Sequence, residues 1–333
     1  MAHNINFNQK TNKHSFMSVA VPAWHGLGQV LSKPANAEEA LIQAGLNFEV
    51  EKKPLLAKVG KQQIIVPNKY ANVRTDTNQV LGVVGKSYTI FQNEQAFSFF
   101  DPIIDRSEAI YHTAGALGNG ERVWILAKLP SYIKVGKDDL IEQYVLLYLS
   151  HDGTTGITAA FTPVRVVCAN TLNFAIKGLV DKITVMHTSN AEARLKQGHK
   201  ILGMSNLLSK ELDGIFNQMA SKKMTSHQFD NYLQTLFPKR NNVDKEDEEE
   251  EDEKRTLFDR HKDEIEEFLE VGIGQQTTTT KGTVFGAYNA IMGWMDHVKY
   301  KNPKDEKKLR SLWFGGGEGF KEKAFLEALK YTN

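Results

Sequence analysis

The sequence predicts an α+β protein, in which an antiparallel β-meander packed by helices is followed by a mostly helical C-terminal region. Three observations predict this fold class. Short β-prone segments separated by Pro, Gly, Asn and Asp fill residues 47–88, and an apolar hairpin is indicated at 145–161. After residue 188 the apolar residues recur at helical spacing.

The elements follow in order from this patterning. Polar caps, glycine stops and apolar stripes predict helices at 36–45, 94–104, 190–220, 225–237, 257–271, 283–300 and 321–331, with a glycine hinge at 315–317. Alternating or short apolar runs predict strands at 48–52, 55–59, 62–66, 70–75, 80–88, 109–114, 122–129, 145–149, 157–161 and 164–168.

The same patterning divides the chain into regions. We expect a flexible N-terminal arm at 1–20, an α+β domain at 21–182 and a helical region at 183–333. Within the last region, residues 244–253 hold nine acids and one lysine, too much charge to pack. We therefore expect a disordered acidic loop over 241–255.

Composition limits the classes of protein to which the chain belongs. Its 333 residues are 41% hydrophobic and 24% charged, and no apolar run is long enough to span a membrane. The N-terminus lacks the pattern of a secretion signal, and a single cysteine, Cys168, excludes an intrachain disulfide. We expect a protein of the bacterial cytoplasm with no membrane partner.

Charge is distributed unevenly around the net value of +1. Residues 1–210 hold 22 Lys and Arg against 16 Asp and Glu, a net of +6. This excess is compatible with a nucleic-acid surface or with an ordinary solvated one. The glycine-rich segments match neither a P-loop nor a dinucleotide fingerprint, so nucleotide hydrolysis is not expected. We predict no cofactor and assign no metal ligands.

The predicted strand at 164–168 ends in a corner at 169–172, after which apolar residues from Leu172 to Ile176 have the spacing of a short buried helix; Arg165 and Asn170 lie at this corner. Such a corner offers unpaired backbone N–H groups to an anion. Arg165 interrupts an apolar run, and a buried arginine requires a paired acid or an anion. Asn170 is either part of that site or a structural cap.

Three motifs along the chain resemble one family. They are PAWHGLG at 22–28, TPVRVVCANTL at 162–172, and AYNA at 287–290 with Asp296-His297. On these residues the chain resembles the phage/plasmid-like family, domain-of-unknown-function family 932, over residues 15–333. The resemblance implies a role on phages, plasmids or integrated elements and carries no established activity.

Basic and aromatic residues alternate along the predicted strands. Cations contact phosphates and aromatic rings stack on bases, so we expect a single-stranded nucleic-acid surface, with DNA favoured. The alternative is a half-buried tyrosine beside cations that only keep the surface soluble. The candidate contacts are Trp24, His25, Tyr70, Arg74, Lys86, Tyr88, Arg165, Asn170, Lys182 and His187.

A polar stripe follows the aromatic helix at 283–300. Asn289 and Asp296 are seven residues apart, about two helical turns, and His297 adjoins them. The stripe is interpreted as a buried polar network, a site or a subunit contact.

Two other classes of function remain open. A metal- or His/Asp-dependent hydrolase or nuclease would use some of the scattered residues His25, His151, Asp152, His187, Asp296 and His297. A homo-oligomeric scaffold or host-interaction protein would use the acidic loop and the N-terminal arm. The leading hypothesis is non-enzymatic: single-strand binding or annealing in recombination or replication.

Overall fold

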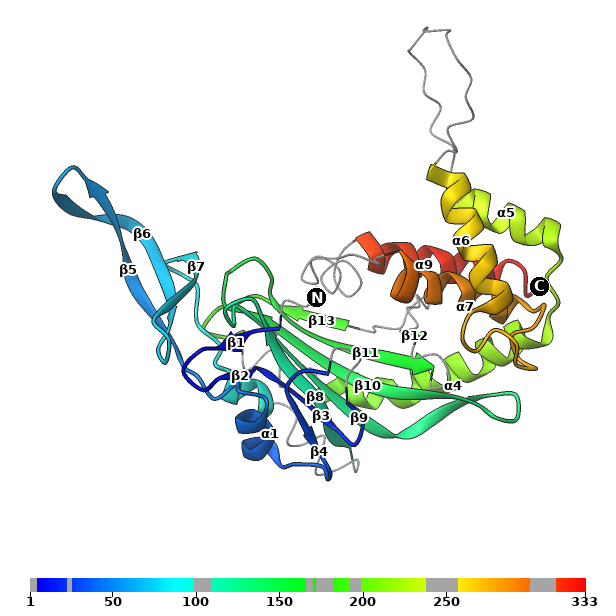
Figure 1. Ribbon diagram of the computed structural model, residues 1–333, viewed down its shortest axis with the longest axis horizontal. Helices are drawn as coiled ribbons and strands as arrows, with labels where there is room; N and C mark the ends of the chain where they lie inside the picture. Colours follow the sequence, from blue (N-terminus) through cyan, green and yellow to red (C-terminus); the bar gives the residue numbers. More distant parts are fainter. Residues whose placement is uncertain are drawn as a thin grey trace, which may run out of the picture.

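The computed structural model describes residues 5–22, 26–98, 109–165, 170–171, 182–191, 199–237, 257–299 and 316–333. Its α+β architecture confirms the predicted fold class, with antiparallel strands in the first half and most helices in the second (Figure 1). No helix in the described part of the chain is long and apolar enough to cross a membrane. The acidic loop predicted at 241–255 lies outside the described residues.

An eight-stranded sheet forms the centre of the molecule, in the order β12-β11-β10-β9-β8-β3-β4, with β13 also paired to β11. All of its pairs are antiparallel except β3 with β4. The strands are β3 (Phe16–Val19), β4 (Gln29–Leu31), β8 (Ile110–Leu117), β9 (Arg122–Val135), β10 (Asp139–Ser150), β11 (Ile157–Arg165), β12 (Asn170–Thr171) and β13 (Lys182–Val185).

The predicted hairpin at 145–161 is the β10–β11 pair, with Tyr144 opposite Thr162 and Leu147 opposite Ala159. We expected the second strand to stop before Pro163, but β11 continues to Arg165. Proline lacks a backbone donor, and Pro163 lies opposite Gln143, where β10 bulges against β9. On the other edge of β11, the described partners β13 and β12 pair with residues 157–160 and 164–165 but not with Pro163, and proline is tolerated at such an edge position.

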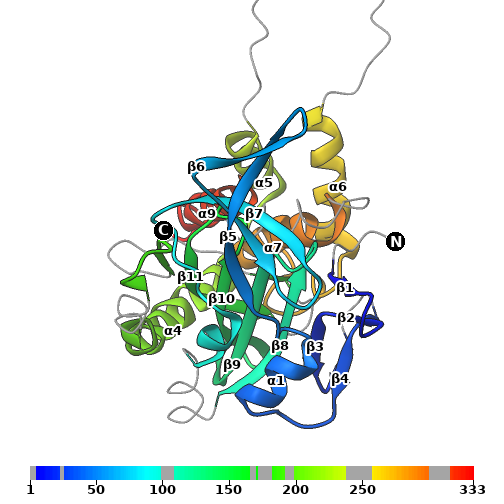
Figure 2. The same cartoon turned by 90° about the vertical axis from the view of Figure 1, so that its left-hand side faces the viewer.

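A second sheet contains β5 (Val50–Val59), β6 (Gln62–Arg74) and β7 (Gln79–Gly85). Its five predicted segments are three longer strands, because β5 and β6 continue through Pro54 and Pro67. Register places Pro54 opposite Tyr70 and Leu56 opposite Ile65, so residues 66–69 of β6 oppose Leu55 alone. This bulge bends the β5–β6 hairpin, which projects from one end of the molecule (Figures 1 and 2).

Within the N-terminal segment expected as a flexible arm at 1–20, residues 5–20 pair with one another and with the central sheet. Residues 5–20 are described, with a small hairpin of β1 (Phe7–Asn8) and β2 (Lys13–His14). Every residue of β3 is buried, and β3 pairs with both β8 and β4. The buried side chains of Phe16, Met17 and Val19 anchor this segment, although its mostly polar composition predicted no anchor.

The helices described at 37–43, 226–236 and 257–271 agree with the predicted ranges, whereas the last helix begins at Gly316 and not at residue 321, and the helices predicted at 94–104 and 190–220 lie partly outside the described residues. Asn36 and Glu39 form a capping box at α1, and Thr225 and Gln228 form another at α5. The helices are α1 (Ala37–Gln43), α4 (His199–Ser221), α5 (Ser226–Leu236), α6 (Leu257–Val271), α7 (Val284–Gly293) and α9 (Gly316–Leu329), with a π-helix, η1 (Trp294–Val298), after α7. Gly316 and Gly317, predicted as part of a hinge, form the first turn of α9.

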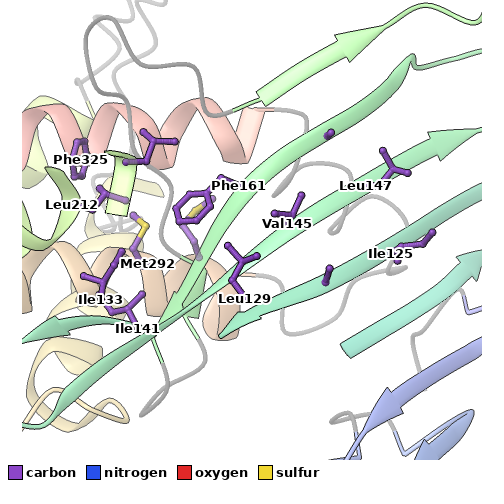
Figure 3. Close-up of a cluster of buried hydrophobic side chains, with 14 of the residues drawn as sticks. Ile125, Leu129, Ile133, Ile141, Val145, Leu147, Phe161, Leu212, Met292 and Phe325 are labelled. Atoms are coloured by element: carbon purple, nitrogen blue, oxygen red, sulfur yellow. The ribbon is translucent and has the colours of Figure 1, made fainter. Parts of the chain in front are cut away.

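One hydrophobic core joins the sheet to the C-terminal helices. Leu212 of α4, Met292 of α7 and Phe325 of α9 belong to the same buried cluster as Ile133 and Phe161 of the sheet (Figure 3). The boundary predicted at residues 182–183 therefore does not separate two cores. At roughly 25 cal/mol per Å² of buried apolar surface, this shared core is the main source of stability.

Candidate nucleic-acid interface

Lysine and tyrosine side chains meet at the base of the β5–β6 hairpin. Lys52 donates from Nζ to the backbone oxygens of Lys86 at 3.0 Å and of Tyr88 at 2.7 Å. The same nitrogen lies 5.0 Å from the centre of the Tyr70 ring, within the range of cation–π attraction. We call Lys52, Lys69, Tyr70, Lys86 and Tyr88 the hairpin base.

Two exposed lysines lie close to Tyr70 along the chain and in the strand register, with Lys69 on the face of the sheet opposite to the Tyr70 ring. Tyr70 lies opposite Val84, and Lys69 lies opposite Gly85, which directly precedes Lys86. Lys69 and Lys86 are exposed, and neither has an ion-pair partner among the described residues. The hairpin base therefore combines two partly buried tyrosine rings with two exposed ammonium groups.

Tyr88 connects the hairpin base to the central sheet. Its ring stacks on His187, with centroids 4.6 Å apart and planes 18° apart, and its hydroxyl donates to the Ser150 oxygen at 2.8 Å. Burial, with the nearby Asp152 carboxylate, raises the pKa of Tyr88. Burial also lowers the pKa of His187 to about 4, so its ring is neutral at pH 7.

Three of the alternative hydrolase residues, His151, Asp152 and His187, converge at this stack. His151 is fully buried, and its Nε2 lies 3.0 Å from the Asn93 side-chain oxygen. Burial, and next the neighbouring His187, lower the pKa of His151 to about 3. The cluster therefore contains two neutral, buried imidazoles.

Asp152 is held by partners on its own loop and on β9. Arg122 donates to its Oδ2 at 3.0 Å, and the Thr154 backbone N–H donates to its Oδ1 at 2.8 Å. Burial alone would raise the pKa of Asp152, but the Thr154 hydrogen bonds and the Arg122 charge hold it below its usual value. Across the described ranges, no group of three or more His, Cys, Asp or Glu is arranged to hold a metal ion.

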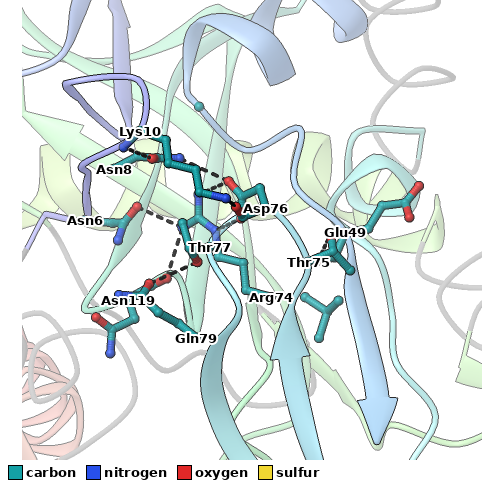
Figure 4. A network of polar contacts seen from close by, with 12 residues as sticks. Asn6, Asn8, Lys10, Glu49, Arg74, Thr75, Asp76, Thr77, Gln79 and Asn119 are labelled. Carbon is teal, nitrogen blue, oxygen red and sulfur yellow. Dashed lines mark hydrogen bonds and ion pairs between the residues drawn. The ribbon is translucent and has the colours of Figure 1, made fainter.

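Arg74, expected on the open face, is buried instead, with 1% of its surface exposed. Its Nε and Nη2 donate to the two Asp76 oxygens at 2.7 and 3.0 Å, and its Nη1 donates to Asn6 and to the Asn119 backbone (Figure 4). The guanidinium also lies 3.8 Å from the centre of the Phe48 ring. Arg74 is thus an internal clamp between β6 and the N-terminal segment, and in this arrangement it is not available to a ligand.

Arg74 lowers the pKa of the Asp76 carboxyl group with which it pairs. Burial on its own would raise the pKa of Asp76, but the hydrogen bonds and charge of Arg74 outweigh it and lower the pKa. The sequence pattern indicated at Arg165 an arginine that, if buried, would require a paired acid or an anion. The structure has that arrangement at Arg74.

Comparison with known protein families yields one match. The family described as Domain of unknown function (DUF932) matches residues 80–313, well over half of the chain. The chain belongs to the DUF932 family. No curated protein and no solved structure matches it.

The DUF932 match begins within β7 and ends before α9. It includes Tyr88, His151 and His187, and the helices α4 to α7. The β5–β6 hairpin, with Lys52, Lys69 and Tyr70, precedes the matched residues. The hairpin base is thus assembled from residues inside and outside the family match.

The remaining predicted contacts of this DUF932 protein lie elsewhere. Trp24 and His25 are outside the described residues. Arg165 lies opposite Asn170 in the β11–β12 pair, and their side chains are likewise outside the described part. Lys182 forms an ion pair with Glu318 of α9, away from the hairpin base.

The polar stripe of the DUF932 chain has partners on several elements. Asn289 is buried and donates to the Phe285 oxygen of its own helix at 2.9 Å. Asp296 accepts from the buried Lys321 of α9 at 2.6 Å. His297 is exposed and stacks on Phe268 of α6. The helix changes to π geometry at Trp294, so the α-helical spacing that predicted a common face does not hold throughout.

Sequence reasoning missed the lysines of the hairpin. Residues 50–69 hold five lysines and one glutamate, a net of +4. This count could have identified Lys52 and Lys69 as candidate contacts. The short predicted strands, however, did not indicate that these lysines belong to one hairpin base with Tyr70 and Lys86. The signal was the local lysine density in a segment of alternating strand pattern.

Proposed function

We propose that this protein binds single-stranded nucleic acid at the hairpin base. The observation that carries the proposal is the group of Lys52, 5.0 Å from the centre of the Tyr70 ring, with the exposed Lys69 and Lys86 at the base of the same hairpin. Ammonium groups neutralise phosphates, while a tyrosine ring stacks on a base without reading its identity. The surface suits an extended strand whose bases are unpaired.

The biological setting is part of the same proposal. Resemblance to phage/plasmid-like proteins supports a role on mobile elements in a bacterial cytoplasm, in single-strand binding or annealing during recombination or replication. The burial of His151 and His187 makes them better suited to holding the hairpin base than to contacting a substrate. This favours binding over hydrolysis.

The test is fluorescence anisotropy with labelled single-stranded and duplex DNA and RNA over a salt series. Each lysine–phosphate contact should contribute a slope of about −0.7 in log K against log salt for a single strand. Lys69→Ala with Lys86→Ala should therefore reduce the slope by about 1.4. Tyr70→Ala should weaken binding at all salt concentrations by about 1–3 kcal/mol, whereas Tyr70→Phe retains the ring.

Lys210→Ala is the matched control, because Lys210 is exposed on α4, away from the hairpin. It should leave both the affinity and the salt slope unchanged. Binding without salt dependence, or an equal loss in the control, would refute the assignment of the hairpin base.

A further inference from the structure

The tip of the β5–β6 hairpin, residues 58–61, presents apolar and basic groups together. Gly60 has φ +61° at the first central position of a two-residue turn, which is typical of a type II′ hairpin. Lys58 and Lys61 are exposed and have no ion-pair partner in the described part of the chain. Val59 is 60% exposed, and Ile65 on the adjoining strand is 63% exposed.

Such a tip is unusual for a free surface. A projecting edge with large exposed apolar side chains is a template for association unless a partner covers it. The lysines give it a positive charge, so the partner surface should combine an apolar cavity with carboxylates.

A cavity with that combination lies among α5, α6 and the start of α7. Its volume is about 420 Å³, in the range of ligand-binding pockets. Apolar Met224, Phe229 and Leu269 line it together with Glu266 and Glu270. It is therefore a hollow of mixed apolar and acidic character.

The negative charge of the cavity is only partly neutralised. Lys262 bonds Asp230 at 2.6 Å and lies 3.6 Å from Glu266. Glu270 is exposed and has no ion-pair partner among the described residues. The rim continues into Val271, 73% exposed, and Ile273, 70% exposed. Among the described residues, the cavity rim therefore combines apolar side chains with an unpaired carboxylate. The hairpin tip combines apolar side chains with lysines that are unpaired in the same ranges, so the two surfaces are opposite in charge.

The hairpin tip and the cavity are at opposite ends of the long axis of the molecule (Figure 1). A tip therefore cannot reach the cavity of its own chain in this arrangement. A contact between the two would join different copies head to tail, and repetition of such a contact produces a ring or a filament.

We propose that the α5–α6 cavity binds the β5–β6 hairpin tip of a second copy of this chain. Lys58 and Lys61 pair with Glu266 and Glu270, and the apolar tip covers the exposed rim. The contact leaves the hairpin base free, so this proposal does not depend on nucleic-acid binding.

Sedimentation velocity of the nuclease-treated full chain over a concentration series tests the proposal. The wild type should self-associate beyond a dimer. Lys58→Glu with Lys61→Glu, and separately Glu266→Lys with Glu270→Lys, should each weaken association at least about tenfold, because like charges then face each other. All four positions are exposed or half-buried, so both chains should fold.

Mixing the two double variants distinguishes this contact from a general charge effect. Each variant repels its own kind, but in the mixture the native tip meets the native cavity and the reversed tip meets the reversed cavity, so the mixture should assemble beyond a dimer again. The chain carrying all four changes should assemble again, since both charges are reversed together. Lys210→Glu and Glu267→Lys, exposed on α4 and α6, are the matched controls and should assemble like the wild type.

Several outcomes would overturn the proposal. They are a wild type that stays monomeric, double variants that assemble normally, and a mixture that stays monomeric. If the tip variant loses nucleic-acid affinity while assembly is unchanged, the tip belongs to the nucleic-acid surface instead. Loss of binding by the hairpin-base variants with normal assembly would leave this inference intact.

Discussion

Two basic residues of the predicted surface, Arg74 and Lys86, differ in burial. Arg74 uses its donors on Asp76, Asn6 and Asn119, so its charge serves the junction between β6 and the N-terminal segment. The bidentate geometry needs a planar guanidinium, which a lysine cannot supply. Lys86, only twelve residues later, remains exposed.

The buried His151 should make stability depend on pH. Its pKa is about 3 in the folded chain and near 6.5 when unfolded, so between these values the unfolded state binds the extra proton. The free energy of unfolding should therefore fall as pH drops below 6.5, by about 1.4 kcal/mol per pH unit for this one group, and should be unaffected by it above.

Urea denaturation from pH 7 to pH 4.5 measures this effect. His151→Gln, which retains a donor toward Asn93, should have a shallower slope by about one proton. His227→Gln is the control, because His227 is exposed on α5. Equal slopes in the wild type and His151→Gln would mean that His151 is not buried in its neutral form.

At the scale of elements, the β5–β6 hairpin is held at its base and free at its tip. Lys52 ties β5 to the segment after β7, and the bulge at 66–69 directs the hairpin away from the sheet. Beyond the bulge the two strands pair only with each other, from Leu56 with Ile65 to Val59 with Gln62. Local stability there depends on the turn.

Gly60→Val should loosen the tip without unfolding the protein. Nothing lies within 4 Å of a Cβ at this position, so the cost comes only from φ +61° and should be about 1–2 kcal/mol. Gly60→Asn should cost less, since asparagine tolerates positive φ. Amide hydrogen exchange should accelerate in 56–65 and stay unchanged in β9 and β10. Faster exchange throughout the sheet would contradict this local role.

At the scale of the whole molecule, the sheet and the C-terminal helices share one core. Leu212, Phe216 and Met219 of α4 are fully buried and belong to the same cluster as the sheet residues. α4 contacts β9 and β11, and α7 contacts both α4 and α9. The helical region therefore depends on the sheet for burial of its apolar faces.

A single cooperative transition should follow from the shared core. Leu212→Ala should lower the free energy of unfolding by about 3 kcal/mol and shift tryptophan fluorescence and helical circular dichroism together. Leu207→Ala, on the same helix but 48% exposed, should change it by less than about 0.5 kcal/mol. Separate transitions for the two signals would mean that the protein does not unfold in a single cooperative step.

Local patterning by itself determined the fold class, the β10–β11 hairpin and the helices with polar caps, such as α5 behind Thr225. These features depend on spacing and capping, which act over a few residues. The same holds for the exposed character of Lys86.

Only the tertiary structure decided which of the basic and aromatic residues meet. Arg74 and Lys69 both lie on β6, yet one is a buried clamp and the other a free cation, because the N-terminal segment covers only one end of the strand. His151 and His187 come together because β13 pairs with β11, a contact between distant segments. Local sequence does not encode such pairings, since their free energy arises from burial shared across the whole fold.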